Sequence, residues 1–251
     1  MKKLFRALLG GREASTERPF CTAVIAAAGN STRMGTQGSK LLLPLDGRPV
    51  IAHTLCAVAR AESIDEIVIA AREEELMAYA DICRDCGIEK PVKVIVGGAT
   101  RTESVLRAAL EANRQAKLIA VQDGARPLVT PELIDATVAA AARTAAAAPA
   151  VPVHDTVKIA ENHTVRETPD RASLFAVQTP QVFDAELLRA ALQSALTDGV
   201  QLTDDCSAVE RIGKEVRLTD GDEENIKITT PLDLLVAEAI LRRREELGEI
   251  E

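Results

Sequence analysis

Residues 27–40 form a loop, AAGNSTRMGTQGSK, that combines three glycines with the cations Arg33 and Lys40. The loop directly follows an apolar run at residues 22–26. A glycine-rich loop that leaves a buried strand turns backbone N–H groups toward an anion. Together with two fixed positive charges, such a loop could hold the phosphates of a nucleoside triphosphate.

This loop differs from the two common phosphate-binding motifs. It lacks the Gly-Lys-Ser/Thr ending of a P-loop, and the spacing of Gly29, Gly35 and Gly38 does not fit the Gly-x-Gly-x-x-Gly pattern of dinucleotide-binding folds. Taken alone, the loop would also fit a tight turn with surface charges. The elements around it must decide between these interpretations.

Short apolar runs alternate with helical patterns in the first 150 residues. Runs typical of strands buried on both faces span residues 23–27, 66–71, 92–96 and 118–122. Helical patterns span residues 49–60, 73–86, 102–113 and 131–147. This order predicts an α/β fold: an open, mostly parallel sheet with right-handed crossovers and helices on both faces.

Two further loops of unusual composition follow predicted strands, at residues 97–101 (GGATR) and 123–127 (DGARP). Because ligands of such sheets bind beyond the carboxyl ends of the strands, we expect these loops to share one site with residues 27–40. Asp123 would offer a hard carboxylate oxygen to a Mg²⁺ ion that bridges a triphosphate. The alternative for Asp123 is a buried ion pair with Arg126.

Residues 149–180 interrupt the alternation. Two polar, alternating segments at residues 155–160 and 164–168 flank a turn at residues 161–163, which predicts a β-ribbon. Such a ribbon has too little apolar area to be stable alone. We therefore expect a protruding arm, at about residues 151–178, that packs on a second copy of the chain in a homodimer. A hairpin folded onto its own domain is the alternative.

The remaining residues return to α/β material. We expect helices at residues 184–196 and 203–211, the second capped by Thr203, short strands at residues 216–218 and 226–229, and a last helix opened by Pro231. No internal repeat or long linker divides the chain. We expect a single domain over residues 20–251, preceded by a flexible leader at residues 1–19.

Composition excludes several classes of protein. A net charge of −8, no tryptophan and one tyrosine argue against a nucleic-acid-binding surface. No apolar stretch approaches the ~20 residues of a membrane span. Five cysteines without a regular framework favour a reducing cytoplasm. Cys83 and Cys86 form a Cys-x-x-Cys pair, but no second pair lies at a zinc-binding spacing.

The motifs in their order resemble the 2-C-methyl-D-erythritol 4-phosphate cytidylyltransferases over about residues 20–245. The motifs are residues 27–35 with Lys40, residues 97–101 with Ser104, residues 123–127, Asp155-Thr156, Thr179-Pro180-Gln181, Thr203-Asp204 and residues 224–227. The resemblance implies a Rossmann-like nucleotidyltransferase domain and a β-arm that exchanges across a homodimer. It also implies an enzyme of the non-mevalonate isoprenoid route that joins CTP and methylerythritol phosphate and releases pyrophosphate.

The resemblance also implies roles for individual residues. Arg33 and Lys40 would stabilise the transition state and the leaving pyrophosphate, and Arg171 and Lys227 would hold the acceptor phosphate. The cytidine and ribose would lie against Ala27, Ala28, Gly29, Gly98, Arg101 and Ser104. Thr156 and Arg126 would contact the acceptor, and Asp123, with Glu224 as a second candidate, would bind the metal.

The motifs depart from the family pattern at two positions, and several other functions are alternatives. Ser31 stands where many members have glycine, and Ala99 stands where an acidic residue can occur. A ribitol 5-phosphate cytidylyltransferase would share the fold and the donor. A transferase of another nucleotide, a non-catalytic nucleotide-binding regulator and a dehydrogenase are more distant alternatives. Transition-state cations argue against the regulator, because a protein that only binds has no need of them.

Overall fold

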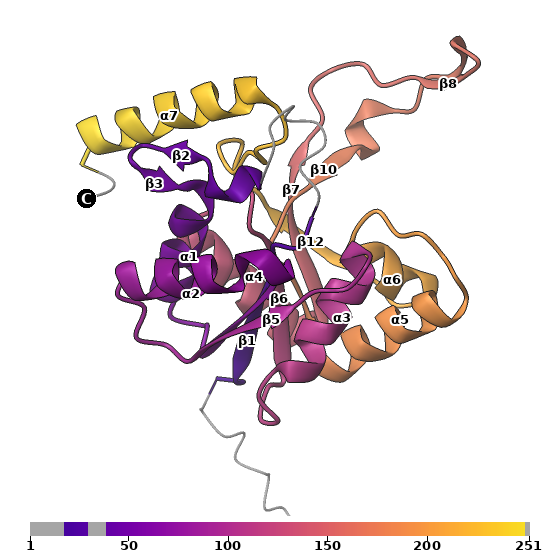
Figure 1. Ribbon diagram of the computed structural model, residues 1–251. Coiled ribbons are helices and arrows are strands. Elements are labelled where there is room, and N and C mark those ends of the chain that lie inside the picture. Colours follow the sequence, from indigo (N-terminus) through magenta and orange to yellow (C-terminus); the bar gives the residue numbers. More distant parts are fainter. Residues whose placement is uncertain (1–17, 30–38, 249–251) are drawn as a thin grey trace, which may run out of the picture.

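The computed structural model describes residues 18–29 and 39–248, and a mixed, largely parallel sheet forms its centre (Figure 1). Its strands run in the order β10-β7-β11-β6-β1-β4-β5, with β12 beside β7. The parallel half consists of β1 (Cys21–Ala26), β4 (Glu66–Ala71), β5 (Val92–Val96) and β6 (Leu118–Asp123). The other half consists of β7 (Ala146–Pro152), β10 (Phe175–Val177), β11 (Gln181–Asp184) and β12 (Arg217–Asp220).

Helices cover both faces of this sheet, as the alternation of runs predicts. One core cluster holds side chains of α1 (Val50–Arg60), α2 (Leu76–Asp85), α4 (Pro131–Thr144) and α7 (Pro231–Glu246). The other holds side chains of α3 (Arg101–Glu111), α5 (Ala185–Thr197) and α6 (Asp205–Arg211). Strands β1, β4 and β6 are buried almost throughout, because each lies between the two helical layers.

The smaller elements lie around this body. They are the 3₁₀ helices η2 (Lys40–Leu42), η3 (Glu73–Glu75) and η4 (Arg171–Ser173), the strand pair β2 (Pro44–Leu45) and β3 (Arg48–Pro49), and the pair β8 (Ile159–Glu161) and β9 (Thr164–Glu167). No helix in the described part of the chain is long and apolar enough to cross a lipid bilayer.

The strand and helix predictions for residues 20–131 are confirmed to within a few residues, but the alanine-rich helix is wrong at its end. Helix α4 stops at Thr144, because Ala145 takes the left-handed conformation with φ 65° and its N–H closes the helix on Ala141. The chain then reverses into β7, whose alanines are buried inside the sheet. Burial in the sheet therefore outweighs the helical preference of alanine at residues 146–147.

Two other expectations for the second half need correction, and two short strands there were not expected. No strand forms at residues 226–229; this segment is a loop held by a hydrogen bond from the N–H of Ile228 to the carbonyl of Ala125. Asp204, not Thr203, caps α6 by accepting from the N–H of Ser207. Strands β10 and β11 were not predicted, because three or four residues carry too weak an alternation.

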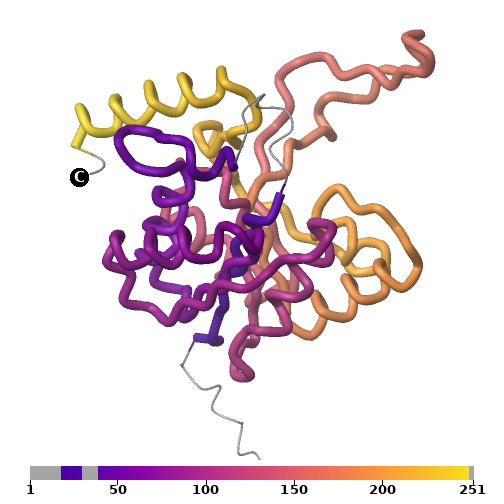
Figure 2. Tube along the Cα trace, viewed as in Figure 1, coloured from indigo at the N-terminus to yellow at the C-terminus, as the bar shows by residue number. Residues whose placement is uncertain are grey.

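The expected arm extends away from the body in Figures 1 and 2. Its turn places Asn162 and His163 at φ 49° and 60°, as a tight two-residue hairpin turn requires. The first arm strand is shorter than predicted and begins at Ile159. Most of the expected leader lies outside the described residues, but Arg18 forms an ion pair with Asp65 at 2.7 Å.

Candidate active site

A cleft of about 510 Å³ opens at the carboxyl edge of the parallel strands, where the three singled-out loops meet. Residues following β1, β4, β5 and β6 contribute to its walls, as the rule for such sheets predicts. Its lining consists of Ala26, Ala28, Gly29, Lys40, Leu41, Arg72, Gly98, Ala99, Thr100, Arg101, Ser104, Asp123, Ala125 and Lys227.

Eight of the predicted site residues therefore line one cleft: Ala28, Gly29, Lys40, Gly98, Arg101, Ser104, Asp123 and Lys227. Ala27 is buried behind them, with its N–H bonded to the carbonyl of Ala70 at 2.9 Å. Arg33 lies outside the described residues.

One wall of the cleft is made of small residues at the start of α3. Ser104 Oγ accepts from the N–H of Gly98 at 2.9 Å and donates to the carbonyl of Thr100 at 2.8 Å. A Cβ on Gly97 would lie 2.6 Å from the Cβ of Ala28 and 2.9 Å from Ser104 Oγ. The loop after β5 therefore packs closely against the loop after β1, and backbone groups can approach a ligand there.

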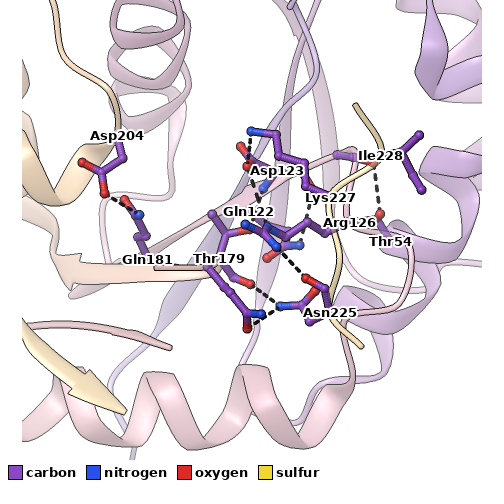
Figure 3. A network of polar contacts seen from close by, with 12 residues as sticks. Thr54, Gln122, Asp123, Arg126, Thr179, Gln181, Asp204, Asn225, Lys227 and Ile228 are labelled. Atoms are coloured by element: carbon purple, nitrogen blue, oxygen red, sulfur yellow. Dashed lines mark hydrogen bonds and ion pairs between the residues drawn. The ribbon is translucent and has the colours of Figure 1, made fainter. Parts of the chain in front are cut away.

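Asp123, at the end of β6, lies within ion-pair distance of three cations, two of which Figure 3 shows. Lys227 Nζ lies 2.7 Å from Oδ2, Arg101 lies 3.5 Å from Oδ1, and Arg126 Nε lies 3.9 Å from Oδ2. Burial alone would raise the pKa of Asp123, but attraction to Arg101 and Lys227 and the Lys227 hydrogen bond outweigh it and lower the pKa to about 2. Asp123 is therefore ionised at neutral pH.

Lys40 reaches the same region from the other side of the cleft. It is the first residue of η2, and its Nζ donates to the carbonyl of Ile228 at 2.6 Å. Ile228 follows Lys227 in the sequence, so the loop at residues 225–229 brings Lys227 and the end of the glycine-rich loop together.

Arg126 supports the loop at residues 225–229 through the backbone of that loop. Its Nη1 donates to the carbonyl of Asn225 at 2.5 Å, and the buried Asn225 amide donates to the carbonyl of Thr179 at 3.0 Å (Figure 3). Thr179 Oγ1 in turn accepts from the N–H of Asp123 at 3.1 Å. Burial lowers the pKa of Arg126, with Asp123 opposing the shift. Thr179 and Asn225 thus fix the residues around Asp123, a role that their motifs did not reveal.

Glu224 lies against α7 and is not among the residues that line the cleft. Its Oε2 accepts from Arg244 Nε at 3.0 Å, and its Oε1 accepts from Arg243 at 2.5 Å. Burial raises the pKa of Glu224, but the two arginines outweigh this effect and lower it. Both carboxylate oxygens are therefore already engaged by cations.

Arg171 and Thr156 lie at the arm and do not line the cleft of their own chain. Arg171 donates to the carbonyl of His154 at 2.7 Å, and Thr156 is exposed. A second, shallow hollow surrounds Arg171; it is lined by Pro152, Val153, His154, Asp170, Arg171, Ala172 and Phe175.

Two charged residues near the cleft escaped the sequence analysis. Arg72 follows β4 and lines the cleft, where Glu75 and Glu74 pair with it. Its place after a predicted strand was a usable signal. Asp205 forms an ion pair with Arg101 at 2.7 Å, and only its position beside Asp204 hinted at a role.

Comparison with known proteins gives matches over most of the chain. The family model described as IspD, 2-C-methyl-D-erythritol 4-phosphate cytidylyltransferase, matches residues 21–243. A curated protein of that description from Caldanaerobacter subterraneus subsp. tengcongensis is 43% identical over 88% of this chain and 99% of its own length. One from Bacillus cytotoxicus is 44% identical over 88% and 97%.

Solved structures are similar over the same part of the chain. The 4-diphosphocytidyl-2C-methyl-D-erythritol synthase of Anaerococcus prevotii superposes with a TM-score of 0.80 and 32% identity, over 89% of this chain and 98% of its own. The 2-C-methyl-D-erythritol 4-phosphate cytidylyltransferase of Thermus thermophilus gives a TM-score of 0.72 and 33% identity, over 89% and 99%.

Proposed function

Because the chain belongs to the 2-C-methyl-D-erythritol 4-phosphate cytidylyltransferase family, we propose that the cleft at the carboxyl edge of its sheet is the site of cytidylyl transfer. The chain transfers the cytidylyl group of CTP to 2-C-methyl-D-erythritol 4-phosphate and gives 4-diphosphocytidyl-2-C-methyl-D-erythritol and pyrophosphate. The observation that supports this site is the meeting of Lys40, Arg101, Asp123 and Lys227 at one edge of the sheet.

The reaction explains why the cleft needs cations. An acceptor phosphate oxygen forms a bond to the α-phosphorus of CTP as the bond from that phosphorus to the β-phosphate oxygen breaks. Both reactants are anions, so catalysis consists mainly of positioning and charge compensation. Lys40, together with Arg33, would stabilise the transition state and pyrophosphate, while Lys227 would hold the acceptor phosphate.

The wall of the cleft formed by the loops after β1 and β5 suits the nucleoside. Ala28, Gly29 and Gly98 leave room for a pyrimidine, and Ser104 fixes the Gly98 backbone. Arg101 extends a guanidinium from the first residue of α3 into this wall. Ala27 would contribute through its backbone, because its side chain is buried.

The residues fit one divalent cation held by a single protein carboxylate. Asp123 is ionised and lines the cleft, and Mg²⁺ commonly takes one or two carboxylates together with substrate phosphates. No group of three or more His, Cys, Asp or Glu is arranged for a metal within residues 18–29 and 39–248. We assign Asp123, and not Glu224, because Asp123 lines the cleft and Glu224 does not. When bound, Mg²⁺ would neutralise charge on the triphosphate.

The arm would complete the site in a homodimer. It carries Thr156 and Arg171 outside the cleft of their own chain, and it exposes apolar side chains that a partner could cover. The exposed apolar residues are Val157, Ile159, Val165, Phe175 and Val177. The acceptor would then be held by Arg171 and Thr156 of one chain and by the cleft of the other, with Arg126 supporting the loop at residue 225.

Mixing two inactive variants tests the exchanged arm. Lys40→Ala impairs the cleft and Arg171→Ala impairs the arm, so a mixed dimer has one site in which both residues are intact. After unfolding and refolding together, we expect activity to recover to about a quarter of the wild-type value. The mixture of Lys40→Ala with Lys227→Ala is the matched control, because both defects lie in the cleft and no intact site can form. No recovery in the first mixture, although dimers form, would contradict the exchange.

The function itself is tested by pyrophosphate release from purified protein with CTP and Mg²⁺. Release should require 2-C-methyl-D-erythritol 4-phosphate and should be largely lost in Lys40→Ala. Release with ribitol 5-phosphate instead would keep the fold and the mechanism but change the acceptor. Release with neither would favour a nucleotide-binding regulator or another nucleotide.

We also propose a cytoplasmic location, because all five cysteines are free thiols. Burial raises the pKa of Cys83 to about 11 and of Cys86 to about 12, so neither has the acidic thiol typical of redox-active pairs. Cell fractionation would test the location, and recovery of the protein only in a secreted or membrane fraction would contradict it.

A further inference from the structure

The guanidinium of Arg101 lies between two carboxylates. Its Nη1 is 2.7 Å from Asp205 Oδ2, whereas its Nη2 is 3.5 Å from Asp123 Oδ1. Arg101 is the first residue of α3, and Asp205 is the first residue of α6. The closer contact is therefore to a residue that does not line the cleft.

Asp205 is a buried carboxylate, and Arg101 is the one cation that pairs with it in the described part of the chain. Asp205 is 1% exposed, and neither carboxylate oxygen accepts a hydrogen bond from the described residues beyond the Arg101 ion pair. Burial raises the pKa of Asp205, Arg101 opposes the rise, and the neighbouring Asp123 and Asp204 add to it. A buried charge without a partner is costly, so Arg101 is the group that allows an ionised Asp205 here.

The backbone of Asp205 is fixed by a buried glutamine of the central sheet. Gln181 Oε1 accepts from the N–H groups of Asp205 at 3.0 Å and Cys206 at 3.1 Å. Gln181 Nε2 donates to Asp204 Oδ2 at 2.9 Å (Figure 3). Gln181 lies in β11, which pairs with the strand that ends at Asp123. Asp205 is thus held at a set place relative to Asp123.

This arrangement decides where the Arg101 guanidinium rests. If the Asp205 charge were removed, the nearest carboxylate to Arg101 would be Asp123, and a close ion pair between them would draw the guanidinium toward the end of β6. We propose that Asp205 is a positioning residue. It holds the Arg101 guanidinium at the nucleotide wall, which is the side of the cleft formed by Ala28, Gly29, Gly98 and Ser104, and keeps it from forming a close ion pair with Asp123. The inference rests on the proposed function, in which Arg101 contacts CTP.

Asp205→Asn tests the proposal, because asparagine keeps the shape of the side chain and removes its charge. We expect the dissociation constant for CTP, measured by calorimetry, to rise about 10-fold, while kcat at saturating CTP changes less than about threefold. In an Arg101→Ala background the same substitution should change the dissociation constant by less than about twofold, because the residue through which Asp205 acts is gone.

Asp204→Asn is the matched control. It makes the same change one position earlier, and asparagine caps a helix about as well as aspartate. Asp204 bonds to Gln181 and Ser207 and not to Arg101, so its substitution disturbs the surroundings of Asp205 without removing the charge that faces Arg101, and should weaken CTP binding several-fold less than Asp205→Asn does. Asp205→Glu, which keeps the carboxylate, should restore most of the affinity that Asp205→Asn loses. Should Asp205→Asn fail to fold, Asp205→Ser carries the same comparison.

The outcomes separate this inference from the function on which it rests. Equal losses of CTP affinity on the wild-type and Arg101→Ala backgrounds would mean that Asp205 acts on the fold in general, and would overturn the proposal. Unchanged affinity in Asp205→Asn would also overturn it, while the nucleotide wall would stand as long as Arg101→Ala weakens CTP binding. Unchanged affinity in Arg101→Ala itself would remove the proposed wall and, with it, the inference.

Discussion

Replacing Lys40 with alanine is expected to lower kcat for cytidylyl transfer by about 100- to 1,000-fold. The ammonium group lies at the cleft beside the loop that carries Lys227, where negative charge would accumulate as pyrophosphate leaves. A cation that acts mainly on the transition state affects kcat more than the binding of CTP. Steady-state pyrophosphate release gives kcat, and calorimetry gives the dissociation constant for CTP.

The Lys40 variant should remain folded. Its Nζ donates a hydrogen bond to the carbonyl of Ile228, and a bond from a charged donor contributes about 1.5 to 3 kcal/mol, which is less than the roughly 5 to 15 kcal/mol by which a folded domain is stable. Lys214→Ala, at an exposed lysine outside the cleft, is the control for the loss of a positive charge and should keep full activity. A loss of affinity for CTP with unchanged kcat would contradict the transition-state role and would make Lys40 a binding residue.

The cleft concentrates positive charge in a protein that is acidic as a whole. The chain has a net charge of −8, yet Lys40, Arg72, Arg101 and Lys227 line the cleft with Asp123 as its acidic residue. Local fields of this kind attract an anionic substrate even when the overall charge repels it. The interior carboxylates Asp123 and Asp205 hold Lys227 and Arg101 in place while no substrate is bound.

The parallel half of the fold was predictable because its signals are local. Strands β4 and β5 have the predicted bounds, since β-branched residues dominate both runs; β4 is buried on both faces as expected, whereas β5 lies at the edge of the sheet and is only partly buried. The place of the cleft followed from topology, because loops after adjacent parallel strands must meet. In the other half of the sheet only β12 was predicted, at residues 216–218; β7 is rich in alanine, and its partners in the sheet make it a strand.

The site shows the same division between local and non-local information. Glycines and charged residues in or beside the loops after the strands marked Gly98, Lys40 and Asp123. The Arg101–Asp205 ion pair joins residues about a hundred positions apart, so no local sequence pattern could predict this contact. Glu224, the second candidate for the metal, pairs with two arginines of α7 and does not line the cleft, and the sequence does not reveal the approach of these arginines.

Asp123→Asn is the second substitution with a large expected effect. We expect kcat to fall by about 100-fold or more, and the Mg²⁺ concentration for half-maximal rate to rise, because a neutral amide is a poor ligand for a hard cation. Binding of Mn²⁺ to the enzyme with CTP, followed by electron paramagnetic resonance, provides a readout independent of activity. Asp198→Asn, at a partly exposed aspartate that pairs with Arg211, is the control and should bind Mn²⁺ as the wild type does.

The dependence on pH separates a metal ligand from a structural ion pair. The cations around Asp123 lower its pKa to about 2, so the carboxylate stays charged at pH 5 to 9, and an acid limb in the rate profile over that range must come from another group. Its contribution to stability is present above the ordinary pKa of an aspartate and is lost as the pH falls through 2. Asp123→Asn should therefore lower the free energy of unfolding at pH 7 more than at pH 2. If stability falls in this way while Mn²⁺ binding and kcat are unchanged, Asp123 is only the partner of Lys227 and Arg126, and the metal must be held by the substrate phosphates alone.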